Sequence, residues 1–143
     1  MDHTDINIIN ILLEDGRGTL KEIGQQVGLT PPAVKERITR LETDQVIEGY
    51  TVKINLAKLN RLVSAFVFVD VTPEKYDSFC RFCEQEEEIV EHHHIIGVHN
   101  SMLRVAVHNS QQLENLLSKI KHYGTSQTDI LLSTYFTAKP IDL

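Results

Sequence analysis

The chain has 143 residues, with 14 lysines and arginines against 20 aspartates and glutamates, and a formal net charge of −6. This balance argues against a protein that coats nucleic acid non-specifically, because such proteins are usually basic. The acidity is uneven, since residues 1–61 carry a net charge of −1 and residues 62–143 carry −5. We therefore expect a nearly neutral N-terminal domain of about 50 residues and an acidic C-terminal domain.

No apolar run approaches the roughly 18 residues that a membrane-spanning helix needs, and the N-terminus lacks the pattern of a signal peptide. We expect a soluble, cytoplasmic protein without a membrane partner. The sequence contains no nucleophile elbow, no phosphate-binding loop and no H-E-x-x-H zinc pair. No catalytic residue and no cofactor are therefore predicted, and an enzyme is the weaker alternative.

Two short amphipathic helices are predicted before residue 28. Thr4 is expected to cap the first helix, which ends at Asp15 and Gly16. The second helix carries apolar residues from Leu20 to Val27 and ends at Gly28. The packing face of the first helix consists of Ile8, Ile9, Leu12 and Leu13.

A third helix begins sharply after Gly28, because Thr30 can act as its N-cap and Pro31 suits its first position. Val34, Ile38 and Leu41 recur at helical spacing and form an apolar stripe. Two helices joined by a glycine turn are typical of a helix-turn-helix unit, whose second helix enters the major groove of DNA.

Polar side chains outside this stripe are the candidates for DNA contact. Arg37 lies beside the stripe, so a structural contact to a helix end or to Glu42 is as good an interpretation as a phosphate contact. The residues predicted to read DNA are Thr30, Pro32, Lys35, Thr39 and Arg40, and the predicted phosphate contacts at the edge are Arg17 and Arg37. Residues 46–54 alternate β-branched and polar side chains, which predicts a short strand and completes a winged helix-turn-helix.

The second half of the chain predicts an α+β domain of βαββαβ order, a ferredoxin-like arrangement with both helices on one face of an antiparallel sheet. The expected strands are residues 62–71, 89–96, 101–107 and 128–137. One helix ends near Gln85, and the other ends at Gly124. Phe66 and Phe68 make the opposite sheet face apolar, and Ile130, Leu131 or Leu132 extend it. We expect another subunit to cover this face, which makes the protein a dimer or a higher oligomer.

The chain resembles the Lrp/AsnC (feast/famine) family of transcriptional regulators over almost its whole length. The motifs in the family's order and spacing are residues 5–9, 15–17, 28–42 and 46–50. The resemblance implies a winged helix-turn-helix domain at 1–50, a linking strand at 51–61, and an effector-binding and oligomerisation domain at 62–143. It further implies double-stranded DNA as a partner, homodimers that assemble into octamers, and amino acids as effectors. An architectural DNA-organising protein without an effector is the alternative.

The family's effector pocket lies near the loop after the second strand of this domain. The family usually has acidic and aromatic residues after the loop glycine, whereas this chain has Val98, His99 and Asn100, so the ammonium group of an amino acid lacks anionic partners. An amino acid, a different ligand and no ligand all stay open. The predicted effector-binding residues are Gly97, Val98, His99, Asn100, Ser101 and Thr128.

Histidines and cysteines suggest two further kinds of site. His92 and His94 share one face of a predicted strand, roughly 7 Å apart, with His99 nearby. They allow a transition-metal site or pH-sensitive assembly, but a polar strand at an edge or interface is favoured, and no metal ligand is predicted. Cys80 and Cys83 have C-x-x-C spacing but no second pair, so we interpret both as small core hydrophobes.

Overall fold

The computed structural model describes residues 1–142, which fold as two compact units. The first unit, which we call the head, contains Met1–Lys53 together with residues 135–142, which we call the tail. The second unit, the C-terminal domain, contains Ile54–Thr134. No helix within residues 1–142 combines the length and the apolar character needed to cross a membrane.

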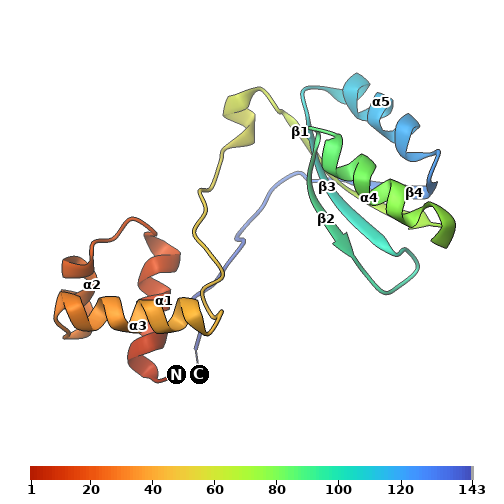
Figure 1. Ribbon diagram of the computed structural model, residues 1–143. Helices are drawn as coiled ribbons and strands as arrows, with labels where there is room; N and C mark the ends of the chain where they lie inside the picture. The colour runs from red at the N-terminus through yellow and green to blue at the C-terminus, as the bar shows by residue number, and fades with distance from the viewer. Residues whose placement is uncertain (143) are drawn as a thin grey trace. The chain divides into compact units, whose positions relative to one another are not determined.

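Three helices form the head: α1 (His3–Glu14), α2 (Leu20–Val27) and α3 (Pro31–Thr43) (Figure 1). α2 and α3 are joined by a tight turn at Gly28, whose φ of 70° lies in the left-handed region that favours glycine. The predicted helix-turn-helix is therefore confirmed. The buried residues that hold the three helices together are Ile6, Ile8, Ile9, Ile23, Val34 and Leu41.

The N-cap of α1 differs from the prediction, whereas the N-cap position of α3 agrees with it. Asp2, and not Thr4, caps α1, because its carboxylate accepts the Asp5 N–H while the Asp5 carboxylate accepts the Asp2 N–H, each at 2.9 Å. This reciprocal capping box satisfies two backbone donors at once, which a lone threonine cannot do. Thr30 does occupy the N-cap position of α3, and Pro31 begins the helix, but the Thr30 side chain makes no capping hydrogen bond.

The strand predicted at residues 46–54 is not formed. The N–H groups of Val46 and Ile47 both donate to the Leu41 carbonyl, at 2.9 and 3.1 Å, and the segment then continues without strand pairing. Ile47 packs against the cluster of Ile6, Ile9 and Leu41. The other apolar side chains of the segment are exposed, so the alternation in the sequence does not mark a buried strand face; they are Val46, Tyr50, Val52 and Ile54. A strand also needs a neighbouring strand to bond, and the described residues provide none here.

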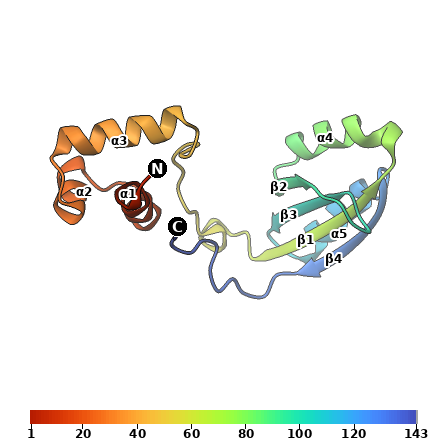
Figure 2. The ribbon, with the colours of Figure 1, turned by 90° about the horizontal axis from the view of Figure 1, so that it is seen from below.

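The C-terminal domain has the predicted βαββαβ order. Its strands are β1 (Val63–Val71), β2 (Ile89–His94), β3 (Ser101–Val107) and β4 (Gly124–Ile130), and its helices are α4 (Tyr76–Gln85) and α5 (Ser110–Ile120). Two short 3-10 helices, η1 (Leu56–Leu59) and η2 (Pro73–Lys75), precede β1 and α4. Figure 2 shows the strands side by side in the order β2-β3-β1-β4, and each neighbouring pair is antiparallel. The ferredoxin-like fold is confirmed.

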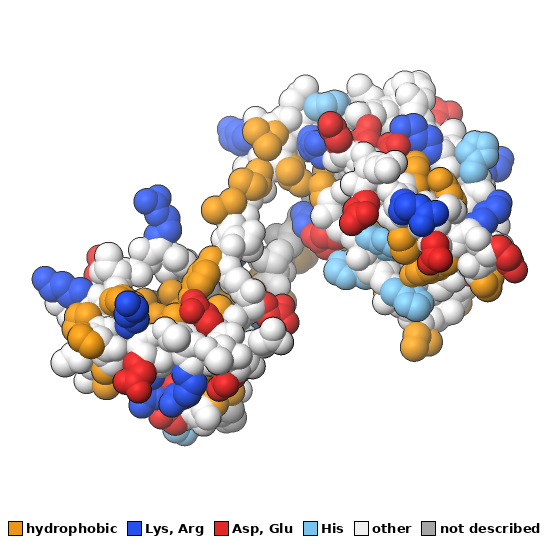
Figure 3. Space-filling model, viewed as in Figure 1, with side chains coloured by type: hydrophobic (Ala, Val, Ile, Leu, Met, Phe, Trp, Pro, Cys, Tyr) orange, Lys and Arg blue, Asp and Glu red, His pale blue; other side chains and the backbone are white. Residues whose placement is uncertain are grey.

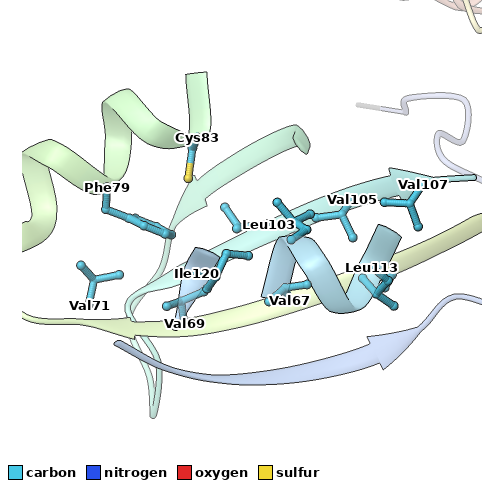
Figure 4. Packing of buried hydrophobic residues seen from close by; sticks show 12 residues of the cluster. Val67, Val69, Val71, Phe79, Cys83, Leu103, Val105, Val107, Leu113 and Ile120 are labelled. Atoms are coloured by element: carbon cyan, nitrogen blue, oxygen red, sulfur yellow. The ribbon is translucent and has the colours of Figure 1, made fainter. Parts of the chain in front are cut away.

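The core of this domain lies between one sheet face and the two helices. Alternate residues of β1 and β3 point toward the helices, because side chains of a strand alternate between its faces. Figure 4 shows Phe79 and Cys83 of α4 and Ile120 of α5 directed into this layer. The buried residues that the two strands contribute are Ala65, Val67, Val69, Val71, Leu103, Val105 and Val107.

The last strand lies earlier than predicted. β4 spans Gly124–Ile130 instead of residues 128–137, and Gly124 begins this strand instead of ending α5. A Cβ atom on Gly124 would lie 1.9 Å from the Asp70 carbonyl oxygen, so glycine permits the close approach of β4 to β1. The prediction failed because β4 is a polar edge strand, which carries no apolar alternation.

The open face of the sheet, away from α4 and α5, carries a partly apolar surface. Phe66 lies opposite Arg104 and Phe68 opposite Met102, and all four side chains are partly buried. Ile130 lies opposite Ala65, whose side chain points toward the helices. The prediction that Ile130 extends the open face is therefore wrong, because the register of β4 turns Ile130 to the other side.

Candidate DNA-binding and effector sites

One side of α3 presents three of the predicted DNA-binding residues to solvent. Pro32, Lys35 and Thr39 are exposed, whereas Val34 and Leu41 on the other side of the helix are buried. Thr30, just before the helix, is exposed as well. A helix in the major groove reads base edges with the side chains on its exposed side. The surface of Thr30, Pro32, Lys35 and Thr39, here called the α3 face, offers hydroxyl, ammonium and apolar groups for this purpose.

The two arginines of α3 bind carboxylates at the N-terminus of α1. Arg37 Nη1 donates to Asp5 Oδ1 at 2.7 Å and to Asp2 Oδ2 at 2.8 Å. Arg40 Nη2 donates to both oxygens of Asp5, each at 2.9 Å. The Asp5 side chain is 1% exposed, whereas those of Arg37 and Arg40 are 26% and 52% exposed. This cluster, the Asp5 network, fixes α3 against the first turn of α1.

Ionisation of the two carboxylates follows from these bonds. The hydrogen bond from Arg37 is the largest cause that lowers the pKa of Asp2 to about 2. Burial by itself would raise the pKa of Asp5, but hydrogen bonds from Arg37 and the Asp2 backbone, with the charge of Arg40, outweigh burial and lower it. Both carboxylates are thus charged near neutral pH and neutralise part of the positive charge of α3.

Charges of both signs are interspersed over the visible face of the head (Figure 3). The head has 7 lysines and arginines against 10 aspartates and glutamates, a net charge of −3, so it has no large basic field for non-specific attraction to DNA. Arg17 lies in the loop between α1 and α2, where it lines a groove of about 710 Å³ together with α1 and residues 46–53. Among the described residues, this lining comes from α1, the loop after it, residues 46–53 and Ile141, and it includes no residue of α3. We call this hollow the head groove.

The loop between β2 and β3 contains most of the predicted effector residues, and Asn100 holds it in place. The Asn100 side chain accepts the Val71 N–H at 3.0 Å and donates to the Val71 carbonyl at 2.7 Å. Its backbone N–H donates to the Val69 carbonyl, and its carbonyl accepts the Ile95 N–H. Both polar atoms of the Asn100 amide are thus engaged by the end of β1, so its role in this structure is to anchor the loop.

The neighbours of Asn100 have different surroundings. Val98 is 89% exposed and Gly97 is exposed. His99 lies 6.0 Å from the ring of Phe68, on the open face of the sheet. Ser101 is buried, with its hydroxyl 3.3 Å from His92 Nε2. A ligand could therefore reach the exposed tip of the loop and the His99 imidazole beside Phe68. The Ser101 hydroxyl is already close to His92.

Thr128 is not brought to this loop. Its partner in the sheet register is Val67, so it faces the helix side of the sheet, whereas His99 lies against Phe68 on the open face. The structure therefore places Thr128 and His99 on opposite faces of the sheet.

Histidine side chains gather over the β2 region of the C-terminal domain (Figure 3). His92 and His94 both pack toward α4, at 5.4 Å from the Phe79 ring and 5.2 Å from the Tyr76 ring. Burial lowers the pKa of His92, with smaller effects from the neighbouring histidines. Within residues 1–142 there is no group of three or more histidine, cysteine or acidic side chains arranged to hold a metal ion.

The two cysteines differ in burial. Cys83 is 5% exposed and belongs to the core, where burial raises the pKa of its thiol to about 12. Cys80 is partly exposed, and both thiols are free. The interpretation as a core hydrophobe fits Cys83 fully and Cys80 in part.

Sequence reasoning missed three residues of the head: Asp2, Asp5 and Asn10. Asp2 and Asp5 form the network with the α3 arginines, and Asn10 bonds the tail. The Asp-x-x-Asp spacing at the start of α1 is a local signal for a capping box and could have identified the first two residues. No local pattern points to the partner of Asn10, which is 131 residues away.

Comparison with known proteins identifies both units. The model of the AsnC-type helix-turn-helix domain matches residues 1–42, and the model of the Lrp/AsnC ligand binding domain matches residues 64–141. The uncharacterised HTH-type transcriptional regulator YezC of Bacillus subtilis is 32% identical over 134 residues, which cover 94% of this chain and 95% of YezC.

Solved structures agree with these sequence matches. Bacillus subtilis LrpC superimposes with a TM-score of 0.90 at 29% identity, covering 96% of this chain and 99% of LrpC. A feast or famine regulatory protein of M. tuberculosis, solved in complex with L-methionine, gives a TM-score of 0.83 at 30% identity, covering 95% of each chain. With a ligand-binding domain model that matches more than half of its length, and a helix-turn-helix model that matches its head, this chain belongs to the Lrp/AsnC family of DNA-binding transcriptional regulators.

Proposed function

We propose that the α3 face reads operator DNA in the major groove, and that a small molecule bound by the C-terminal domain controls this binding. The observation that carries the proposal is the exposed row of Pro32, Lys35 and Thr39 on a helix that follows a tight turn. Each head presents few free cations, so affinity for one half-site is low and two heads must bind together for a stable complex.

The side chains of the head have distinct roles in this proposal. Lys35, Thr39, Thr30 and Pro32 contact base edges. The half-exposed Arg40 uses the guanidinium N–H groups that Asp5 leaves free to contact a phosphate. Arg37 supports α3 through the Asp5 network, and Arg17 contacts a phosphate from its loop.

The test begins with selection of an operator from a random duplex library by the full-length protein. Lys35→Ala is then compared with Lys58→Ala, which removes the same charge from an exposed residue of the C-terminal domain. We expect Lys35→Ala to weaken operator binding by about tenfold, and either to lower the salt slope by about one or to relax one base position. Equal affinities of the two variants would contradict the assignment of the α3 face.

We further propose that the open face of the sheet pairs with a second copy, and that the dimers assemble into octamers. Phe66, Phe68 and Met102 give this face apolar area, and the Glu91–Arg104 ion pair at 2.7 Å lies beside them. A self-complementary surface of this kind suits a twofold dimer, which would also present two heads to a symmetric operator.

Light scattering coupled to size-exclusion chromatography tests this assembly. Phe68→Lys is expected to lower the molar mass of the particle, because it places a charge in the interface. Leu59→Lys, at a 60% exposed residue of η1, is the control and should leave the mass unchanged. A monomeric wild-type protein, or an assembly that tolerates Phe68→Lys, would contradict the proposal.

For the effector we propose an amino acid bound near the β2–β3 loop. Support comes from the M. tuberculosis relative, whose structure contains L-methionine. In this chain Asn100 is engaged by Val71, so His99, Val98 and Gly97 are left as the groups that can contact a ligand.

A thermal-shift screen of the twenty L-amino acids, with L-methionine first, tests the effector. A ligand present at 100 times its Kd stabilises the folded protein by about 2.7 kcal/mol and raises its melting temperature. His99→Ala should abolish the shift, whereas the control His122→Ala, at an exposed residue after α5, should retain it. If no amino acid shifts the melting temperature, the amino-acid assignment is rejected.

A further inference from the structure

The Asn10 side chain bonds the tail to the head. The Asn10 amide donates from Nδ2 to the Ile141 carbonyl at 2.9 Å, and its Oδ1 accepts the Ile141 N–H at 2.8 Å. Both backbone groups of one tail residue are thus paired by one residue of α1. A carboxamide suits this task because it carries a donor and an acceptor side by side. The pair recognises backbone groups that every residue except proline carries, so the choice of tail residue depends on the Ile141 side chain.

The Ile141 side chain provides an apolar contact at the same place. It lines the head groove, which has a volume of about 710 Å³, and about half of its surface is covered. Leu13, Val46 and Val52 of the groove are themselves 45%, 47% and 74% exposed, so the groove is an apolar surface with room for a ligand. The apolar residues that line it are Ile9, Leu12, Leu13, Val46, Ile47, Tyr50 and Val52.

The tail is suited to bind in an extended form. Residues 132–141 contain no helix or strand, so their backbone groups are not committed to helix or sheet hydrogen bonds. Pro140 fixes the backbone φ just before Ile141, and the Lys139 ammonium lies 4.6 Å from the centre of the Phe136 ring. Both features reduce the conformational freedom that the tail loses when it binds.

We propose that the head groove is a docking site for the protein's own tail, in which Asn10 binds the backbone of Ile141 and the Ile141 side chain is the apolar anchor. Ten residues, 131–140, separate Ile141 from the end of β4. The docked tail is therefore a second covalent connection between the C-terminal domain and the head, besides the segment that leads from residue 53 into β1. This connection gives the effector domain a route to the DNA-binding head, and only this consequence depends on the proposed function.

Hydrogen–deuterium exchange of the full-length protein, read by mass spectrometry, tests the docking. In Asn10→Ala we expect exchange to accelerate about tenfold both in the C-terminal peptide and in residues 46–53. Asn7→Ala is the matched control, because Asn7 is an exposed asparagine of the same helix and the substitution changes helix propensity equally. Ile141→Ser removes the apolar anchor but keeps the backbone groups, and should give a smaller acceleration in the same two segments.

Unchanged exchange in Asn10→Ala would overturn the proposal, as would an equal acceleration in Asn7→Ala. DNA binding need not be measured for either outcome, so the docking can fail while the proposed function stands, and the reverse also holds.

Cross-linking identifies which copy supplies the tail. Lys53 lines the groove and Lys139 lies two residues before Ile141, so an amine-reactive reagent can join them. In a mixture of ¹⁴N-labelled and ¹⁵N-labelled protein, refolded together, we expect Lys53–Lys139 links within chains of one label. Links that join the two labels would assign the groove to the tail of a second copy and overturn the proposal as stated.

Discussion

Asp5 of α1 accepts a hydrogen bond of 2.7 Å from Arg37 of α3, although the two residues are 32 positions apart. The Asp5 carboxylate is almost completely buried, so this pair lies between the helices and is not a surface ion pair. A buried charge that loses its partner is strongly destabilising, whereas a paired one is tolerated. The position of the α3 face on the head therefore depends on residues that need not touch DNA themselves.

Asp5→Asn tests this dependence. The substitution keeps the size of the side chain but removes the charge that Arg37 and Arg40 bind, and we expect the free energy of unfolding to fall by about 2 kcal/mol. Operator affinity should fall as well, because α3 is less firmly positioned. Urea unfolding and fluorescence anisotropy provide the two measurements. Asp44→Asn, at the exposed end of α3, is the control, and equal behaviour of the two variants would contradict a positioning role.

The same network predicts a pH dependence. The pKa of Asp2 is lowered from 3.8 to about 2, and that of Asp5 is also lowered. A carboxyl group with a folded pKa below its unfolded pKa stabilises the fold while ionised, so its contribution is complete above about pH 4 and is lost as the pH falls toward 2. Arg37→Gln should therefore have a lower melting temperature than wild type at pH 7, and the difference should shrink between pH 4 and pH 2. Arg81→Gln, on the exposed side of α4, should show no such convergence.

Gly124 predicts a steric limit at the edge of the sheet. In Gly124→Ala the new Cβ would meet the Asp70 carbonyl oxygen at 1.9 Å, so β4 must move away from β1. We expect a loss of about 2 kcal/mol in the free energy of unfolding, measured in urea. Gly49→Ala places its Cβ where no atom lies within 4 Å, and should change stability by less than about 0.5 kcal/mol. A Gly124→Ala protein as stable as Gly49→Ala would show that the strands can adjust.

The sequence predicts best those helices and strands whose signals lie within the element itself. α2 was predicted from its apolar spacing and its terminal glycine, and β3 from its bounded apolar run, because both signals lie within the element itself. The prediction for β4 is wrong because this polar strand carries no apolar alternation, and its position depends instead on the fit of Gly124 against Asp70, which are more than fifty positions apart.

In the candidate sites, too, local features could be predicted and contacts between distant residues could not. The exposure of Lys35 and Thr39 follows from helix periodicity and could be predicted. The pairing of Arg37 and Arg40 with Asp5, and the bonding of Asn100 to Val71, arise between elements that are far apart in sequence. The sequence already allowed a structural contact of Arg37 to a helix end, and the structure shows it at the start of α1. For Arg40 and Asn100 the sequence indicated polar groups available to ligands, and only the tertiary structure reveals that the protein itself binds them.

The thiols should differ in reactivity. Burial raises the pKa of Cys83 to about 12, so little thiolate forms at pH 8, whereas Cys80 is partly exposed. We expect iodoacetamide to modify Cys80 first in the native protein, and both residues in 6 M urea. Peptide mass spectrometry measures the extent of modification at each residue. Equal native rates would contradict the burial of Cys83 in the core.

Asn100→Asp separates a structural role of Asn100 from ligand contact. The substitution replaces the Nδ2 donor that bonds the Val71 carbonyl with an oxygen, so two acceptors face each other, and we expect a loss of about 2 kcal/mol in the free energy of unfolding at pH 7. Protonation of the new carboxyl group restores a donor, so its folded pKa is raised and the variant should approach wild-type stability as the pH falls below about 4. Asn109→Asp is the control, because Asn109 caps α5 by accepting the Gln112 N–H, a task that aspartate also performs. If Asn100→Asp is as stable as Asn109→Asp at pH 7, the amide of Asn100 does not anchor the loop and is free for an effector.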